Sequence, residues 1–125
     1  MTEQEKQLLL KDLCARLPYG TKVKLGKYIK IVESVSFEKE GVYVWIEGGN
    51  FPIHNAKPYL RPMSSMTEEE AKEWNQLLPH DDWHIGDPII FDWLNAHHFD
   101  YRGLIEKGLA LEAPEGMYEI VPTHA

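Results

Sequence analysis

The chain has 125 residues, 43% of them hydrophobic and 26% charged, which is ordinary globular composition and suits one domain or two very small lobes. Its single cysteine, Cys14, excludes an internal disulfide and a zinc site built from several cysteines, and a reducing compartment is the simplest setting. The start, MTEQEKQLLLK, does not have the basic opening of a secretory signal, and no apolar run approaches transmembrane length. We therefore expect a cytoplasmic protein without membrane contact.

The net charge of −7 is divided unevenly along the chain. Residues 1–62 hold ten Lys/Arg and seven Asp/Glu, whereas residues 63–125 hold three Lys/Arg and thirteen Asp/Glu. Such an asymmetry indicates either a partner for one half or attraction between the two halves. We favour the second interpretation, because a modest charge split needs no partner.

The first predicted element is a helix that begins after Thr2. Thr2 followed by Glu5 forms a capping box, and Pro18 and Gly20 end the helix. Leucines recur at helical spacing at positions Leu9, Leu10, Leu13 and Leu17. Cys14 lies beside them and is predicted to be a small apolar residue on the buried face.

Residues 21–47 are predicted to form β-strands, because apolar and polar residues alternate over 21–25, 28–37 and 41–48. The side chains predicted to face inward are Val23, Leu25, Ile29, Ile31, Val35, Phe37, Val42, Val44 and Ile46. Polar turns at 38–41 and 48–50 connect the strands, and Phe51–Ile53 is a candidate for a fourth. The result is a small antiparallel meander, and the pattern leaves open whether it closes into an SH3-like barrel.

Pro58 and Pro62 indicate a connector between the strands and the helices that follow. Thr67 and Glu70 form a second capping box, so a helix is predicted over about Glu68–Leu78.

A further helix is predicted from Pro88 to about His97, with Asp87 as its N-cap. Asp100 is placed to cap a short helix over Tyr101–Lys107, and Gly108 to end it. Short strands are predicted near Leu109–Glu112 and Tyr118–Val121. The whole chain therefore predicts an α+β fold: an N-terminal helix, a small antiparallel β-meander and C-terminal helices. We expect one compact domain over residues 1–125, with a β-rich lobe at about 19–62 and a helical, acidic lobe at about 66–125.

Three segments resemble a known group of sequences: EQEKQLLLKDLCARLPYG, KPYLRPMSSMTEEE and, above all, DWLNAHHFDYRGLIEKGLALEAPEGMY. They are similar to small, uncharacterised proteins of gut Bacteroides-type bacteria and of their phage-like or mobile elements. The resemblance covers about half of the chain. It implies a setting in a phage or mobile element, but no activity, because proteins of this group have none assigned.

No motif of a known enzyme class occurs in the sequence: GxSxG, the P-loop and the dinucleotide fingerprint are all missing. The best candidates for metal ligands are His80 and His84, whose spacing would bring both rings to one face of a helix. Pro79 and the polar neighbours indicate a loop instead. We therefore predict no catalytic residues and no cofactor, and keep a metal-dependent enzyme as a weak alternative.

The β-strands offer one candidate surface for single-stranded nucleic acid. It consists of Lys22, Lys24, Lys30, Tyr43 and Trp45, which share the outward parity of their strands. Aromatic rings beside lysines suit base stacking combined with phosphate attraction. We favour the alternative in which a helix covers the two aromatic rings, and the acidic C-terminal half would also repel phosphate.

The C-terminal segment offers the other candidate surface, formed by Trp93, Phe99, Tyr101 and Arg102. Aromatic residues and arginine are common at the energetic centres of protein interfaces. These residues can equally belong to the core, and burial of Trp93 and Phe99 would weaken the case for an interface. We predict a non-enzymatic, cytoplasmic protein-interaction or accessory protein of a phage or mobile element, with a nucleic-acid-binding module as the alternative.

Overall fold

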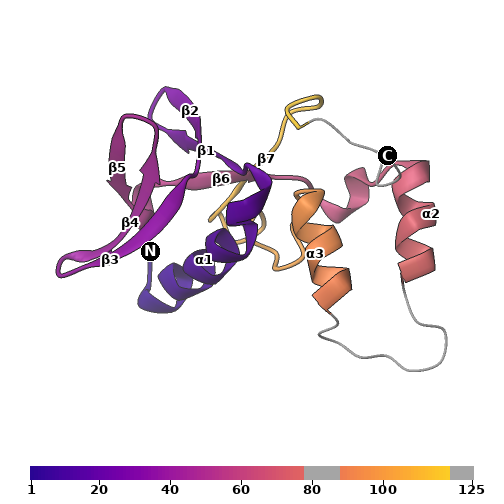
Figure 1. The fold of residues 1–125 in the computed structure, drawn as a ribbon, viewed down its shortest axis with the longest axis horizontal. Helices are drawn as coiled ribbons and strands as arrows, with labels where there is room; N and C mark the ends of the chain where they lie inside the picture. The colour runs from indigo at the N-terminus through magenta and orange to yellow at the C-terminus, as the bar shows by residue number, and fades with distance from the viewer. Residues whose placement is uncertain (78–87, 119–125) are drawn as a thin grey trace.

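The strands and the C-terminal helices occupy opposite ends of the molecule, and the N-terminal helix lies between them (Figure 1). The computed structural model describes residues 1–77 and 88–118. The elements are α1 (Glu3–Arg16), β1 (Lys22–Leu25), β2 (Tyr28–Ile31), β3 (Ser34–Glu38), β4 (Gly41–Ile46), β5 (Gly49–Pro52), β6 (Lys57–Leu60), α2 (Glu68–Leu77), α3 (Pro88–Ala96) and β7 (Leu111–Glu112), with 3-10 turns at Leu17–Tyr19, Ile53–Asn55 and Met63–Ser65. This confirms the predicted α+β fold with its N-terminal helix.

Helix α1 begins where the sequence predicts. The Thr2 hydroxyl accepts from the Glu5 N–H at 3.1 Å, and the Glu5 carboxylate accepts from the Thr2 N–H at 2.8 Å, so the capping box is present. The predicted leucines Leu9, Leu10 and Leu13 are buried. The prediction for Cys14 is wrong, because its side chain is exposed. The buried face of the helix continues through Asp12 and Arg16 instead.

The strands form two small sheets that share one bent segment. The first sheet has the order β2-β1-β6-β7 and the second β3-β4-β5. At the bend, the Val32 N–H bonds to the Thr21 carbonyl beside β1, and the next N–H, of Glu33, bonds to the Trp45 carbonyl of β4. This segment links the two sheets, and a 3-10 turn precedes β6, the strand that returns to pair with β1.

The bend also changes which side chains point inward. Val32 is buried at the corner, while the two residues after it, Glu33 and Ser34, are both exposed, so the alternation shifts by one residue. Three side chains predicted to face inward are exposed: Ile29 by 49%, Ile31 by 50% and Phe37 by 72%. The two isoleucines precede the shift and therefore lie on the outer face. Phe37 has the predicted parity but sits near the tip of the β3–β4 hairpin.

Strand β6 lies within the segment that the sequence assigns to a connector. It pairs antiparallel with β1 and parallel with β7, so the first sheet is mixed. Pro58, within β6, is paired with β1 but has no N–H to donate. One step further along the register, the Tyr118 hydroxyl accepts from the Lys22 N–H at 2.9 Å and donates to the Tyr59 carbonyl at 2.7 Å. This hydroxyl thus bridges the two strands where their own ladder ends.

Helix α2 starts at the second predicted capping box. The Thr67 N–H donates to Glu70 at 2.9 Å, and the Glu70 N–H donates to the Thr67 hydroxyl at 3.1 Å. Helix α3 ends in a Schellman motif, in which the Phe99 N–H bonds to the Leu94 carbonyl and the His98 N–H to the Asn95 carbonyl. His98 occupies the left-handed position of this motif, with φ of 64°, where glycine is usual.

The predicted short helix over Tyr101–Lys107 is wrong, because these residues form turns. Asp100 nevertheless caps the first turn, since its carboxylate accepts from the N–H groups of Leu104 and Ile105 at 2.9 and 3.0 Å. Gly108 adopts the expected left-handed conformation, with φ of 75°. The predicted N-cap Asp87, Leu78 of the second helix and the residues after Tyr118 lie outside the described part of the chain.

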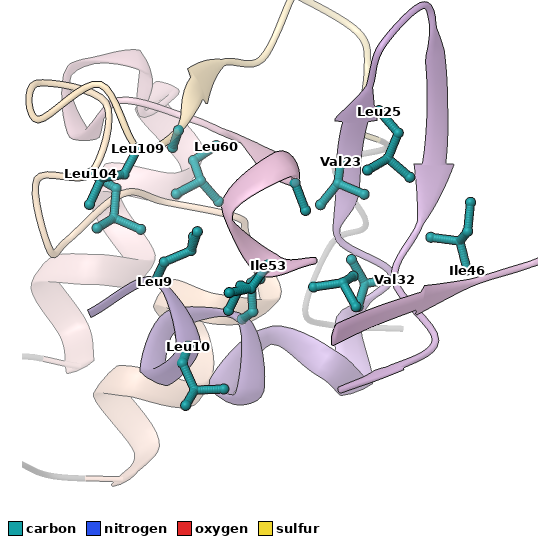
Figure 2. Packing of buried hydrophobic residues seen from close by; sticks show 14 residues of the cluster. Leu9, Leu10, Val23, Leu25, Val32, Ile46, Ile53, Leu60, Leu104 and Leu109 are labelled. Atoms are coloured by element: carbon teal, nitrogen blue, oxygen red, sulfur yellow. The ribbon is translucent and has the colours of Figure 1, made fainter. Parts of the chain in front are cut away.

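Two groups of apolar side chains form the core. The larger group joins α1, the strands and the C-terminal segment (Figure 2), and it consists of Leu9, Leu10, Leu13, Val23, Leu25, Val32, Val44, Ile46, Ile53, Ala56, Leu60, Leu104, Leu109 and Ala110. The smaller group, Ile90, Trp93, Leu94 and Phe99, lies under α2 and α3. Within residues 1–77 and 88–118, no helix is long and apolar enough to cross a membrane.

Candidate functional site

The C-terminal interaction candidates make internal contacts. Trp93 and Phe99 are buried in the smaller core, and Tyr101 and Arg102 are only partly exposed. The Tyr101 hydroxyl donates to the Asn95 side chain at 3.0 Å. The burial of Trp93 and Phe99 weakens the case for a partner surface at this segment.

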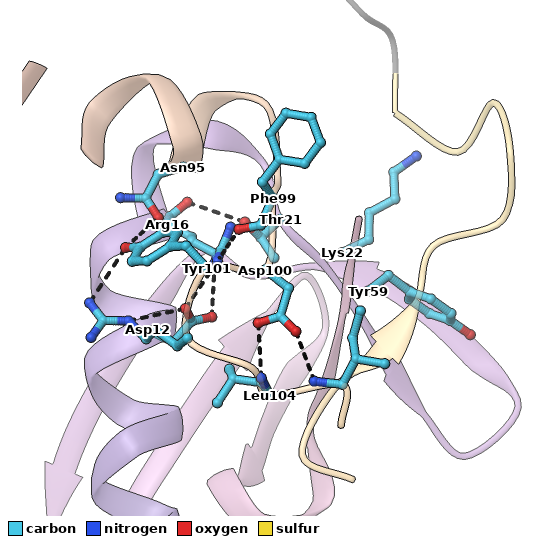
Figure 3. Close-up of polar contacts among 12 residues, drawn as sticks. Asp12, Arg16, Thr21, Lys22, Tyr59, Asn95, Phe99, Asp100, Tyr101 and Leu104 are labelled. Carbon is cyan, nitrogen blue, oxygen red and sulfur yellow. Dashed lines mark hydrogen bonds and ion pairs between the residues drawn. The ribbon is translucent and has the colours of Figure 1, made fainter. Parts of the chain in front are cut away.

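A buried ion cluster ties α1 to the segment after α3 (Figure 3). Arg16 donates to both carboxylate oxygens of Asp12, at 2.8 and 3.0 Å, and also to the Phe99 carbonyl at 2.7 Å. Arg102 Nε lies 3.3 Å from Asp12 Oδ1. Asp12 and Arg16 are fully buried. These contacts join different parts of the same chain, although Arg16 Nη1 and Arg102 Nε are buried and have no hydrogen-bond partner among the described residues.

Glu70 is the centre of a second buried cluster. Its carboxylate accepts two hydrogen bonds from Arg61, at 2.8 and 2.7 Å, and lies 2.9 Å from Nδ1 of His97. Burial alone would raise the pKa of Glu70, but the hydrogen bonds from Arg61 and from the Thr67 backbone outweigh it and lower the pKa to about 2. A carboxylate that is buried and ionised at neutral pH cannot serve as a general acid, and the contacts of Glu70 hold Arg61 and His97 in place.

The nucleic-acid candidates do not gather on one face. Lys22 and Lys24 lie on the outer face of the first sheet. The register pairs Lys30 with buried Val23, so the Lys30 side chain points to the inner face. The outward parity predicted for Lys30 is therefore wrong, for the same reason as that of its neighbouring isoleucines. Tyr43 and Trp45 belong to the second sheet.

Trp45 is 38% exposed, and its indole N–H donates to the Ser36 hydroxyl at 2.8 Å. The prediction that a helix covers Trp45 is therefore wrong, whereas Tyr43 is partly buried. The weak metal candidates His80 and His84 lie outside the described residues. Within the described part of the chain, no group of three or more His, Cys, Asp or Glu side chains could hold a metal ion.

The best candidate surface is one that the sequence did not indicate. Across β2, β1 and β6, the register places Ile31 beside Lys22, Ile29 beside Lys24, and Lys24 beside Lys57, all on the outer face. We call these five residues the hairpin face. Strand β2 is the outermost strand of its sheet, so both half-exposed isoleucines lie at an edge.

A groove of about 790 Å³ runs along this surface. Residues of the β1–β2 hairpin form one side and residues 114–117 the other, while Glu33 and Glu47 contribute acidic groups. The Lys22 ammonium donates to the Met117 carbonyl at 2.9 Å and so holds the two sides together. The arrangement suits a binding partner that is elongated and partly apolar.

A scan against protein-family models and searches of curated proteins and of solved structures found no match to this chain.

Proposed function

We propose that this chain is a non-enzymatic protein-interaction module and that its hairpin face binds the partner protein. The observation that carries the proposal is the pair Ile29 and Ile31, each about half exposed, on the outer face of an edge strand. Single exposed apolar residues are common on protein surfaces. Two exposed apolar side chains on one edge strand are unfavourable, because an apolar edge promotes aggregation and is normally protected by charged residues, proline or a covering segment. A partner that covers this edge gives a reason for keeping them.

The energetics fit a reversible interaction. Burying the exposed half of each isoleucine would contribute roughly 1 kcal/mol per residue. The lysines of residues 22–31 form no ion pair with any acid in the described part of the chain. The Lys22 ammonium bonds to the Met117 carbonyl, so the charges of Lys24 and Lys30 are the ones most available to a partner. Charges at the rim of an interface mainly raise the association rate and select the partner.

The setting that we propose is the cytoplasm of a bacterium that carries a phage or mobile element, with the chain as an accessory protein of that element. This part of the proposal rests on the resemblance of residues 92–118, 3–20 and 57–70. An exposed lone thiol, Cys14, suits a reducing compartment.

Single-stranded nucleic acid is the alternative ligand. Exposed Trp45 and the lysines of the first sheet favour it, but they lie on different sheets. The thirteen acidic residues after position 62 would repel phosphate. A protein partner explains the exposed isoleucines, for which a polyanion offers no comparable contact.

The test compares tagged forms of the protein in its native cells, with quantitative identification of the proteins that each form retains. The variant Ile29→Ser/Ile31→Ser should lose a partner that the unaltered protein retains. Phe37→Ser is the matched control, because Phe37 is also an exposed apolar residue but lies outside the hairpin face. Equal loss in both variants, or retention by the double variant, would refute the role of this face. Recovery of RNA or DNA in place of protein would favour the alternative.

A further inference from the structure

We propose that the hairpin face receives its partner as an extended strand, which adds antiparallel to the open edge of β2 and places acidic residues beside the lysines of the hairpin. This inference rests on the proposed function and specifies the chemistry of the partner. It depends on three features of β2: the direction of its backbone groups, the face of its apolar side chains, and the change of charge along its length.

The backbone groups of Ile29 and Ile31 point away from β1. In an antiparallel ladder, only alternate residues direct their N–H and C=O groups toward a given neighbour. The Val32 N–H bonds to Thr21 on the β1 side, whereas the N–H of Glu33 bonds to β4 on the opposite side. The direction of the backbone groups alternates along the strand, so those of Ile31 and Ile29, two and four residues before Glu33, point the same way as those of Glu33. Strand β2 is also the last strand of its sheet. Their N–H and C=O groups are thus directed toward the open edge.

The side chains add to this pattern. Residues of an added strand that pair with Ile29 and Ile31 would direct their side chains to the same outer face. There they would contact the two exposed isoleucines, so apolar residues are expected at alternate positions of the partner. The residue between them would lie opposite Lys30, where an acidic side chain is favoured.

The charge changes along the edge. Residues 22–31 contain four lysines and no acidic residue, while Glu33 follows β2 in the chain and lines the groove together with Glu47 and Glu115. A strand that runs antiparallel to β2 would therefore begin with a basic residue near Glu33 and finish with an acidic one near Lys27. Antiparallel pairs are also slightly more stable per residue than parallel pairs.

A synthetic peptide tests this arrangement directly. The sequence KTVEVTE places its two valines opposite the isoleucines, its central glutamate opposite Lys30, and its last glutamate near Lys27. Binding is followed by the amide NMR signals of the full-length protein and by their deuterium exchange. We expect the amide signals of Ile29 and Ile31 to shift and their exchange to slow about tenfold at saturation. The amide of Val32, already bonded to Thr21, should change little.

Methylation of the peptide backbone provides a control that leaves the protein unaltered. The N–H groups of the two valines would point toward β2, whereas that of the central glutamate would point away. N-methylation of either valine should weaken binding about tenfold, since a hydrogen bond is lost and a methyl group is placed in the pairing edge. N-methylation of the central glutamate should have little effect. Equal effects at the three positions would overturn strand addition.

Two further comparisons complete the test. The reversed sequence ETVEVTK has the same composition and should bind several-fold more weakly; equal binding would overturn the assigned direction. On the protein, Ile29→Pro removes an outward N–H without touching the β1 ladder, while Ile29→Val keeps it. Only the proline variant should lose the peptide.

The outcomes separate this inference from the proposed function. If the peptide does not bind but Ile29→Ser/Ile31→Ser still loses the cellular partner, strand addition fails and the interaction module stands. If both fail, neither proposal survives. If oligothymidylate shifts the same amide signals and the peptide does not, the face binds nucleic acid and both proposals are overturned.

Discussion

Removal of the Asp12 carboxylate should destabilise the fold severely. Asp12 and Arg16 are fully buried, and Arg16 donates two hydrogen bonds to this carboxylate. Among the described residues, Asp12→Ala would leave the guanidinium of Arg16 with the Phe99 carbonyl and the face of the Tyr101 ring, but no carboxylate, and would also release Arg102. Breaking a buried ion pair by deleting one partner costs about 3–5 kcal/mol. We expect a loss in this range, a large part of the stability of a small domain.

The double variant Asp12→Leu/Arg16→Met identifies the cause of the loss. It removes both charges and fills the space with apolar atoms, which is often nearly neutral for a buried pair. The Phe99 carbonyl would lose the hydrogen bond from Arg16 but keep the one from the Tyr101 N–H, so this loss costs roughly 1 kcal/mol. The double variant should therefore be more stable than Asp12→Ala. Glu3→Ala, which breaks the exposed pair with Lys6, should change the free energy of unfolding by less than about 0.5 kcal/mol.

The assay is urea denaturation at pH 7, followed by far-ultraviolet circular dichroism, with the free energy of unfolding extrapolated to water. A loss below about 1 kcal/mol for Asp12→Ala would refute the reasoning. A double variant as unstable as the single one would refute it too, because the penalty would then not come from an uncompensated charge.

Four further predictions concern other buried or partly buried polar residues. Burial and the nearby cations lower the pKa of His98 to about 4. Between pH 6.5 and 4 the unfolded chain therefore binds a proton that the folded chain does not, so the free energy of unfolding should fall by up to about 3 kcal/mol as the pH is lowered through this window. Denaturation curves measured at each pH test this. The lowered pKa of Glu70, about 2, should add a second loss of stability between pH 4.5 and 2, absent in Glu70→Gln. Tyr118→Phe removes the hydroxyl that joins Lys22 to Tyr59, and should cost roughly 1–3 kcal/mol in urea denaturation; no change would mean that solvent replaces the bridge. His98→Gly should be about 1 kcal/mol more stable than His98→Ala in thermal melts, because glycine relieves the left-handed strain that alanine keeps; the reverse order would contradict this account.

The features that the sequence predicted correctly depend on neighbours within one turn of chain. Both capping boxes, at Thr2 and at Thr67, are formed by a residue and its third successor. The αL glycine at Gly108 follows from a local backbone requirement. Such features can be predicted from the sequence because the interacting residues are close together in the chain and the helix itself fixes their geometry.

The features that it missed depend on contacts between distant segments. Nothing local indicates that Pro58 lies in a central strand, because the pairing of β6 with β7 joins residues about fifty positions apart. The phase shift after Val32 is equally non-local, since it exists only because the strand passes from β1 to β4 at that point. Alternation was therefore correct for Val44 and Ile46 on one side of the corner and wrong for the strand before it.

The case for the C-terminal candidate surface is weakened for a related reason. Composition cannot distinguish an aromatic residue in the core from one at an interface, and Trp93 and Phe99 proved to be core. The Asp12–Arg16 pair carried a readable signal, because opposite charges at i and i+4 meet on one helical face. That signal cannot reveal that the pair is buried. Its burial depends on the segment at Phe99, more than eighty residues away.

The two interpretations of the charge split, a partner for one half or attraction between the halves, do not exclude each other. Arg61 with Glu70 joins a basic residue of the first half to an acidic residue of the second, and Arg102 with Asp12 joins the halves in the opposite sense. These contacts involve arginines, whose planar guanidinium groups suit bidentate, buried pairing. The lysines of residues 22–31 are more strongly hydrated charges on flexible stems, and no acid in the described part of the chain pairs with them. Attraction between the halves therefore accounts for the pairing of Arg61 and Arg102, and the hairpin lysines are the charges that an acidic partner would neutralise.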